Sequence, residues 1–273
     1  MKTPARPALW GVLNVTPDSF SDGGTFLNPQ VALEHAHQMV AEGASVIDVG
    51  GESTRPGAQR VSAEEEQERV VGIVRELSAA GITVSIDTMR SETARLALDA
   101  GAAIVNDVSG GLADEAMVPL IAQSDCDYVM MHWRVHSESM DEAAVYDDVV
   151  ADVARELQQR LGAALDAGIQ RDRIILDPGL GFAKTADHNW ALLADVSAVI
   201  GTTQRAVIGA SRKRFLGALL PKDHLPPQRD AVSATLGALL AAQGVWALRV
   251  HNVRAHREAL DVWQSLSHGI KHA

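Results

Sequence analysis

Cysteine is almost absent from this sequence: Cys126 is the single one among 273 residues. No disulfide can form within the chain, which excludes a disulfide-stabilised framework and is compatible with a reducing compartment. The cytoplasm is the simplest expectation, because residues 1–7 and the uncharged stretch 231–248 also indicate neither a signal peptide nor a membrane span. Cys126 itself is expected to be a small buried residue and not a nucleophile, because no base can be placed beside it.

Positive charge is also scarce. Lysine and arginine number 24 against 35 aspartates and glutamates, which gives a formal net charge of −11. A protein that binds nucleic acid non-specifically, or an anionic membrane surface, needs the opposite balance, so we expect neither partner. An acidic protein can still bind a small anion, provided that its few cations gather in one place.

Long apolar segments are lacking as well. Residues 1–7 have no apolar core of the kind that a signal peptide carries. The uncharged stretch 231–248 contains Ser233, Thr235 and Gln243, and Gly244 divides it. This pattern predicts a helix over 230–243 followed by a buried strand, rather than a membrane span.

Several motifs are missing too. No G-x-G-x-x-G loop follows the first apolar segment, as an open doubly wound nucleotide-binding sheet would usually show. The histidines have no spacing typical of a zinc site. No linker or low-complexity tract separates two parts of the chain, so we expect one domain over residues 1–273.

What the sequence does contain is a regular alternation of short segments rich in valine and isoleucine with longer amphipathic ones. The strands are predicted at 8–14, 45–49, 82–87, 102–107, 127–132, 173–177, 205–209 and 246–251. The helices are predicted at 29–43, 62–80, 90–100, 114–123, 147–168, 187–200, 212–220 with 230–243, and 254–267. Eight strands that are apolar throughout, each followed by a helix, predict an α/β fold, the closed (β/α)8 TIM barrel.

Helix boundaries carry their own signals. Ser62 with Glu65 forms a capping-box pattern, and acidic residues follow in the first turn of that helix. Glycine falls just past four helical patterns, where a left-handed residue ends a helix. These glycines are Gly43, Gly81, Gly101 and Gly168.

Polar side chains stand at the ends of the predicted strands. They are Asn14, Asp48, Asp87, Asn106, Asp107, His132, Asp177, Ser211, Arg212, Lys213, Arg249 and His251. In a barrel these ends meet at one rim, where this fold builds its active site. One such residue can simply end a strand before a turn. The whole set indicates a binding site, because buried charge is costly unless it is paired.

The chemistry of this rim is mixed. Asp87, Asn106 and Asp177 offer acceptors and an amide, which suit a heterocycle with several N–H groups. Cations suited to phosphate groups stand beside them. They are Arg55, Arg212, Lys213, Arg249 and His251. The basic segment 211–217 also opens a predicted helix, whose amides can face an anion; an exposed basic patch is the alternative.

Two segments, 14–24 and 50–58, are rich in glycine and hydrogen-bonding side chains, and we expect mobile loops over the rim. Asn14, Asp18 and Asp22 offer the hard oxygen ligands that magnesium takes together with phosphate. An ordinary turn, with side-chain-to-backbone hydrogen bonds, is the alternative for each of them.

The order of these motifs resembles that of the dihydropteroate synthases, over about residues 9 to 265. The matching blocks are residues 14–24, 50–58, Ser85-Ile86-Asp87-Thr88, 106–110, Met131-His132, 177–182, Ser211-Arg212-Lys213 and Arg249-Val250-His251. Any one block could mislead, but the ordered set is highly specific. The resemblance implies a transferase that condenses 6-hydroxymethyl-7,8-dihydropterin pyrophosphate with p-aminobenzoate, giving 7,8-dihydropteroate and pyrophosphate in folate biosynthesis.

The resemblance also assigns roles to residues. Asp87, Asn106, Asp177 and Lys213 would hold the pterin, and Arg249 would stack on it and, with His251, hold the pyrophosphate. Asn14 and Asp22 would bind Mg²⁺. Residues framing the aminobenzoate would be Thr54, Arg55, Pro56, Phe20, Phe182 and Lys213. The family further implies a homodimer packed through barrel helices, and inhibition by sulfonamides, which mimic the second substrate.

The implied chemistry needs no strong base, because the arylamine attacks with its own lone pair. Asn252, Trp133, Val135 and Ala183 depart from the commonest family pattern; none is assigned to chemistry, but they put the shape of the loop after the fifth strand in doubt. Two rival functions are a pterin-binding methyltransferase on the same barrel and a catalytically idle pterin-binding paralogue. The first predicts no cation cluster and no 50–58 loop, and the second predicts that such residues have been lost.

Overall fold

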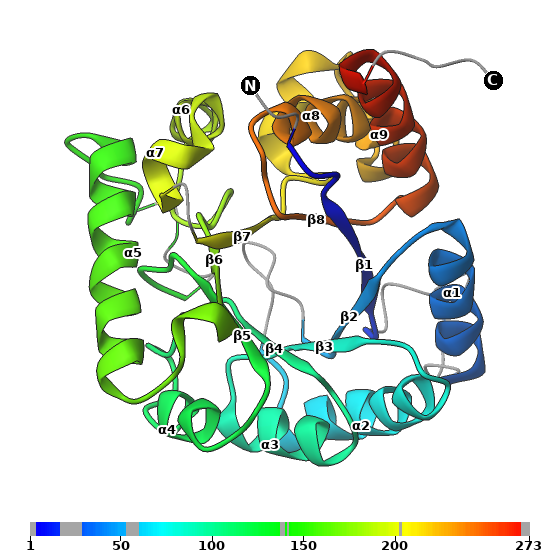
Figure 1. Ribbon diagram of the computed structural model, residues 1–273, viewed down its shortest axis with the longest axis vertical. Coiled ribbons are helices and arrows are strands. Elements are labelled where there is room, and N and C mark those ends of the chain that lie inside the picture. Colours follow the sequence, from blue (N-terminus) through cyan, green and yellow to red (C-terminus); the bar gives the residue numbers. More distant parts are fainter. Residues whose placement is uncertain are drawn as a thin grey trace.

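The computed structural model describes residues 4–16, 29–52, 60–136, 140, 142–201 and 204–268. Eight parallel strands form a closed barrel in the order β1 to β8, and β1 pairs with β8 to close it (Figure 1). The strands are β1 (Ala8–Asn14), β2 (Val46–Gly50), β3 (Val84–Asp87), β4 (Ile104–Asp107), β5 (Asp127–Met131), β6 (Ile174–Asp177), β7 (Arg205–Ile208) and β8 (Ala247–Val250). The predicted (β/α)8 barrel is confirmed.

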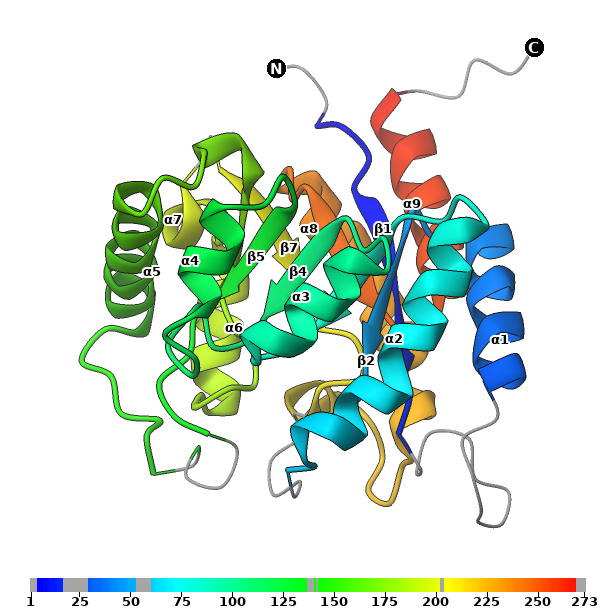
Figure 2. The same cartoon turned by 90° about the horizontal axis from the view of Figure 1, so that it is seen from below.

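Helices surround the barrel on its outside (Figure 1). The α-helices are α1 (Pro29–Glu42), α2 (Ala63–Ala79), α3 (Ser91–Asp99), α4 (Met117–Ala122), α5 (Val149–Asp166), α6 (Ala186–Ala194), α7 (Val196–Ile200), α8 (Asp230–Ala242) and α9 (Val253–His268). The 3₁₀ segments are η3 (Arg171–Arg173), η4 (Arg214–Leu219) and η5 (Pro226–Arg229). Figure 2 shows η4 at the end of the barrel toward which the strands point.

Two predicted helices differ from the structure. The helix predicted over 187–200 is divided at Asp195, whose non-helical backbone ends α6 and whose Oδ1 accepts the Ala198 amide of α7 at 3.1 Å. The one predicted over 212–220 is the 3₁₀ segment η4. The uncharged stretch 231–248 forms a helix, α8, and then a strand, β8, as predicted. Among the described residues, no helix is long and apolar enough to cross a membrane.

The predicted helix boundaries are mostly confirmed. Ser62 accepts the Glu65 amide at 3.1 Å, while the Glu65 carboxylate pairs with Arg69. The four glycines predicted to end helices all have positive φ, where a side chain would be strained: Gly43 at 113°, Gly81 at 77°, Gly101 at 105° and Gly168 at 98°.

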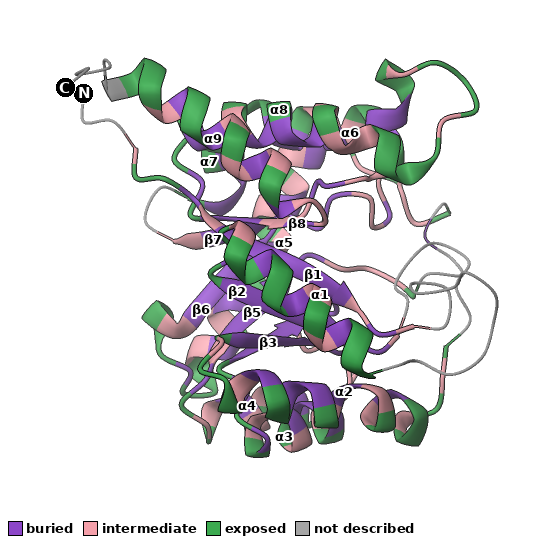
Figure 3. Ribbon diagram, turned by 90° about the vertical axis from the view of Figure 1, so that its right-hand side faces the viewer, coloured by how far each residue is buried: buried purple, intermediate pink, exposed green. Residues whose placement is uncertain are grey.

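The strands are buried along most of their length, whereas the helices expose one side (Figure 3). Side chains alternate across each strand, so one set packs outward against the helices and the other fills the barrel. The inner set forms a separate apolar cluster of Trp10, Val46, Ile104, Val129, Ile175, Val207 and Ala247. This cluster closes the barrel interior and forms the floor under the candidate site.

Candidate active site

A polar layer lies above this apolar floor, because it occupies the next inward position on five of the eight strands. Moving two residues along leads from Val46 to Asp48, from Ser85 to Asp87, from Ile104 to Asn106, from Ile175 to Asp177 and from Ala247 to Arg249. Asp48, Asp87, Asn106 and Asp177 are all buried. The alternation of the strands thus directs every member of this layer into the barrel.

Arg249 lies between two carboxylates of the layer. Its Nε donates to Asp48 Oδ2 at 2.6 Å, and one terminal nitrogen donates to Asp87 Oδ2 at 2.7 Å. Asn106 Nδ2 donates to the same Asp48 oxygen at 3.1 Å. Three side chains from three strands are therefore held together through Asp48, which has no role in the expected site.

Asp48 also has an unused acceptor. Its Oδ1 is buried and has no hydrogen-bond partner among the described residues. Buried polar atoms are nearly always paired, so an orphaned carboxylate oxygen in a polar layer is a position where a ligand N–H could donate. Within an otherwise apolar strand, Asp48 stood out in the sequence, but nothing there identified its partners.

The electrostatics of the layer favour bound ligand groups. Burial raises the pKa of Asp87 to about 7, and the Arg249 guanidinium only partly offsets this. Burial likewise raises the pKa of Asp177. Burial opposes the charge of Arg249, but Asp48 and Asp87 outweigh it and hold the pKa of the guanidinium above its usual value, so it stays cationic. The layer can accept hydrogen bonds from a polar ligand.

Asp177 and Lys213 meet beside the layer. Asp177 Oδ1 accepts the Gly179 amide at 2.7 Å, and its charge interacts with both Lys213 and Arg249. Lys213 Nζ donates to the Leu180 carbonyl and lies 4.3 Å from the centre of the Phe182 ring. Burial lowers the pKa of Lys213 to about 8, although Asp177 acts in the other direction.

Gly181 makes room for this lysine. Its φ is +75°, and a Cβ there would lie 3.0 Å from Lys213 Cδ. A side chain would be strained by the left-handed backbone and would also displace the lysine. The glycine-rich segment after β6 therefore sets where the Lys213 ammonium group lies.

A second series of hydrogen-bonded polar side chains lies at the same end of the barrel, and the sequence did not predict it. Lys184 Nζ donates to His132 Nδ1 at 2.9 Å and to the Phe182 carbonyl at 3.1 Å, and His132 Nε2 contacts Glu156 Oε2 of α5 at 2.9 Å. Burial lowers the pKa of Lys184 to about 7, and burial together with Lys184 lowers that of His132 to about 3. Nothing in the sequence distinguishes Lys184 from an exposed loop lysine.

Other strand-end residues divide into two groups. His251 remains at the rim, where its Nδ1 lies 3.1 Å from Ser211 Oγ. Asp107 faces outward, where it accepts hydrogen bonds from Ser109 and from the Tyr128 hydroxyl at 2.8 Å. Burial raises the Asp107 pKa, and its role is to support the loop behind the barrel wall.

Arg212 does not contribute a free cation, contrary to expectation. Its guanidinium makes two hydrogen bonds to Asp230 at the start of α8, at 2.6 and 2.7 Å. Asn252, at a position where the resembling family often has an acid, donates its amide to Asp230 at 3.0 Å. A carboxylate at that position could not donate this hydrogen bond.

Some expected site residues lie outside the described part of the chain. They are Phe20, Asp22, Thr54, Arg55 and Pro56, together with Asp18. The loops expected over 14–24 and 50–58 fall largely on these residues. Asn14 is described, at the end of β1 and level with Gly50 of β2. The described residues contain no group of three or more histidine, cysteine or acidic side chains that could hold a metal ion.

The geometry brings Asp87, Asn106, Asp177, Lys213 and Arg249 to one end of one barrel, as the sequence predicted. Buried acceptors suit the N–H groups of a flat heterocycle, and Lys213, together with the Arg249 guanidinium that Asp48 and Asp87 hold in the layer, offers N–H donors for an attached anion. Fold and site together define a (β/α)8-barrel enzyme for a heterocyclic, anionic substrate.

Comparison with known proteins defines the family. A family model for pterin binding enzymes matches residues 10–251. A dihydropteroate synthase of Mycobacterium leprae is 52% identical over 257 residues, covering 92% of this chain and 90% of the relative. The chain therefore belongs to the dihydropteroate synthase family of pterin-binding enzymes.

Solved structures agree. A Xanthomonas albilineans dihydropteroate synthase with 4-aminobenzoic acid superposes with a TM-score of 0.89 at 41% identity, covering 97% of this chain and 94% of that one. The same organism's enzyme in complex with 7,8-dihydropteroate gives 0.87 at 39% identity, with 97% and 95% covered.

Proposed function

We propose that this chain catalyses the dihydropteroate synthase reaction, joining the methylene carbon of 6-hydroxymethyl-7,8-dihydropterin pyrophosphate to the nitrogen of p-aminobenzoate. The observation that carries the proposal is the buried layer in which Arg249 lies between Asp48 and Asp87. Support also comes from the 52% identity to a relative of that name.

The pterin ring is proposed to lie on this layer. Asp87, Asn106 and Asp177 face its N–H and carbonyl edge, and Lys213 donates from the rim. The free Oδ1 of Asp48 supplies a further acceptor. Since a flat heterocycle leaves few ways to satisfy several buried acceptors at once, the layer selects a pterin over smaller rings.

The chemical step requires the C–O bond to pyrophosphate to break, with both electrons leaving on the pyrophosphate oxygen. The electron-rich dihydropterin delocalises the resulting cation, and the arylamine nitrogen then forms the new C–N bond and loses a proton to solvent. Arg249 and His251 are proposed to stabilise the departing anion. No residue needs to act as a strong base.

Magnesium is proposed as the cofactor, held by Asn14 and Asp22. Asn14 is suitably placed at the end of β1, and its amide oxygen is a hard ligand. Mg²⁺ usually takes only one or two protein oxygens and fills its other positions with water and substrate phosphates. The absence of a larger ligand group among the described residues is compatible with that mode. When bound, the ion would neutralise charge on the pyrophosphate.

The aminobenzoate is proposed to bind next to Phe182 and Lys213, whose cation–π contact forms one side of the rim. Phe20, Thr54, Arg55 and Pro56 complete this subsite in the proposal. Sulfonamides, as mimics of the second substrate, should then compete for the same place.

A homodimer in the cytoplasm is the proposed form of the protein. Exposed apolar side chains on the helices support a dimer: Leu239 of α8 is 62% exposed and Val262 of α9 is 63% exposed. Light scattering on a sizing column would show twice the chain mass of 29.1 kDa; a monomer at micromolar concentration would contradict the proposal.

The function is tested by incubating the pure protein with the pterin pyrophosphate, Mg²⁺ and p-aminobenzoate, and measuring dihydropteroate and pyrophosphate. Equal amounts of both products are expected. Lys213→Ala and Asp177→Ala should abolish product formation while Arg95→Ala, at an exposed site on α3, leaves it unchanged. Turnover near normal in the first two variants would contradict the assigned roles.

A further inference from the structure

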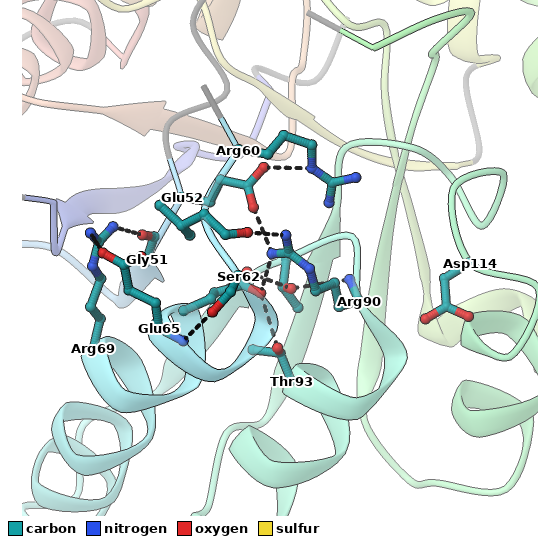
Figure 4. Close-up of polar contacts among 12 residues, drawn as sticks. Gly51, Glu52, Arg60, Ser62, Glu65, Arg69, Arg90, Thr93 and Asp114 are labelled. Carbon is teal, nitrogen blue, oxygen red and sulfur yellow. Dashed lines mark hydrogen bonds and ion pairs between the residues drawn. The ribbon is translucent and has the colours of Figure 1, made fainter. Parts of the chain in front are cut away.

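Two clusters of buried polar side chains lie at the strand ends but take no part in the proposed reaction. At the ends of β2 and β3, one nitrogen of Arg90 lies 2.6 Å from Glu52 Oε2 and 2.6 Å from Glu66 Oε2, so these charges satisfy one another (Figure 4). At the ends of β5 and β6 the basic group is Lys184, which forms no ion pair with a carboxylate among the described residues. Charge pairing therefore explains the first cluster and does not explain the second.

His132 presents an acceptor to Lys184, because Glu156 of α5 fixes the imidazole tautomer. Nε2 of His132 lies 2.9 Å from Glu156 Oε2, and since a carboxylate only accepts, Nε2 carries the proton. Nδ1 is then the acceptor, and Lys184 Nζ donates to it at 2.9 Å. Arg134 holds the other oxygen of Glu156 at 2.5 Å. The Lys184 amino group is thus held through His132 by a helix on the outside of the barrel.

Two consecutive backbone carbonyls after β6 accept hydrogen bonds from side chains at this end of the barrel. Lys184 Nζ donates to the Phe182 carbonyl at 3.1 Å, and the Tyr146 hydroxyl donates to the Ala183 carbonyl at 3.1 Å. Ala183 has a φ of +47°, a left-handed conformation that is strained for a residue with a Cβ. Because this backbone is not one that alanine prefers, the two hydrogen bonds are needed to hold it in place.

Phe182 connects this pair of hydrogen bonds with the proposed aminobenzoate subsite. The centre of its ring lies 4.3 Å from Lys213 Nζ, which itself donates to the Leu180 carbonyl. The Phe182 amide donates to the Gly179 carbonyl at 3.1 Å. Gly179 lies so close to the end of β5 that a Cβ there would be 2.2 Å from the His132 carbonyl oxygen. The ring is therefore carried by a turn whose backbone is fixed on both sides of it.

We propose that Lys184 is a positioning residue for the second substrate and acts through Phe182. It touches neither substrate. It fixes the Phe182 carbonyl, and with it the direction of the ring that aminobenzoate meets beside Lys213. The inference rests on the proposed function for its kinetic readout.

The test is a double-mutant cycle that combines Lys184→Met with Phe182→Leu. Methionine keeps an unbranched apolar side chain at position 184 but donates no hydrogen bond. We expect Lys184→Met alone to raise the KM for p-aminobenzoate about fivefold or more, the equivalent of one lost hydrogen bond, and to change the Kd of the pterin pyrophosphate less than about twofold. In the Phe182→Leu background the same substitution should change the aminobenzoate KM less than about twofold, because the ring that Lys184 positions is absent.

Thr93→Val is the matched control. Thr93 is buried and donates to Glu66 Oε2 at 3.0 Å in the cluster of Figure 4, so this variant also loses one buried hydrogen bond but should keep the parent's aminobenzoate KM. Hydrogen exchange adds a readout independent of turnover: the amides of residues 179–183 should exchange faster in Lys184→Met and not in Thr93→Val. Unchanged exchange in Lys184→Met would overturn the proposal. An equal loss for both substrates, or a KM effect of the same size in the Phe182→Leu background, would show a merely structural role and overturn it too.

If Lys184→Met does not fold, Tyr146→Phe removes only the hydroxyl that holds the Ala183 carbonyl and keeps the ring that packs on Arg134. A smaller selective rise in the aminobenzoate KM, again lost in the Phe182→Leu background, supports the proposal, and no selective rise overturns it. Failure of the proposed function looks different: the parent protein would then form no dihydropteroate, while the exchange experiment would still report whether Lys184 holds this turn.

Discussion

Arg249 is the cation that contacts both Asp48 and Asp87, so replacing it with methionine leaves two buried carboxylates without that partner. Breaking a buried ion pair by removing one member costs about 3–5 kcal/mol of unfolding free energy. For 273 residues, the entropy of unfolding is about 0.6 kcal/mol/K, which converts this loss into a Tm lowered by roughly 5–9 °C.

The loss should also depend on pH. The pKa of Asp87 in the folded protein, about 7, already lies above its ordinary value of 3.8, and Arg249 holds it down. Without Arg249 it rises further. A carboxyl with a raised folded pKa destabilises the protein increasingly as pH climbs toward that pKa. In the parent, the loss of unfolding free energy caused by ionising Asp87 reaches its full size near pH 7. In the variant this loss continues to grow above pH 7, by about 1.4 kcal/mol for each further unit by which the Asp87 pKa is raised.

Urea unfolding followed by circular dichroism at pH 6 and pH 8.5 measures both effects. Arg249→Met should lose more stability at pH 8.5 than at pH 6. Arg95→Met is the control: Arg95 and its partners are exposed and screened by solvent, so this variant should show almost the parent's stability at either pH. A cost for Arg249→Met that is the same at both pH values, or as small as the control, would refute the account of the layer.

Three further outcomes follow from the same structure. The pKa of Lys184 is about 7 in the folded protein, below its ordinary value of 10.5, so protonated Lys184 lowers the unfolding free energy fully below pH 7 and not at all above pH 10.5. As the pH falls from 10 to 7, Lys184→Met should therefore become more stable relative to the parent. Denaturant midpoints of the two proteins that shift in parallel over this range would contradict this. Gly181→Ala should cost about 1–2 kcal/mol and raise the KM for the pterin substrate by displacing Lys213, which steady-state kinetics would detect; a normal KM would show that the lysine adapts. Tyr128→Phe should lose about 1–3 kcal/mol by removing one of the two donors to Asp107 Oδ2, yet keep kcat unchanged; a large fall in kcat would place Asp107 in the site.

Much of the fold was predictable because each strand is buried on both sides. Every predicted strand is present, and its bounds differ by no more than two residues, since only short apolar segments fit a barrel wall. The helices were harder at two places, 187–200, which is divided, and 212–220, which is the 3₁₀ segment η4. The pattern over 187–200 is apolar enough for one helix, but Asp195 caps a second one there.

The sequence predicted which strand-end residues belong to the site, but it did not predict which of them contact one another. Asn106 and Asp107 are adjacent and equally polar, and only the register of β4 turns the first into the barrel and the second out of it. Arg212 and Arg249 carry the same charge, yet Arg212 pairs with Asp230 at the start of α8, 18 residues further on, whereas Arg249 pairs with Asp48 and Asp87 inside the polar layer.

Local chemistry along the chain is enough to specify eight buried strands, the helices between them and the family to which the motifs belong, because periodicity and spacing are properties of neighbouring residues. Two other features do not follow from neighbouring residues. One is the pairing of Asp48 with Arg249, which are separated by 201 positions, and the other is the burial of Lys184 against His132. They exist because closing the barrel brings distant strands within hydrogen-bonding distance and removes water from between them, and those contacts set the charges that the proposed reaction would use.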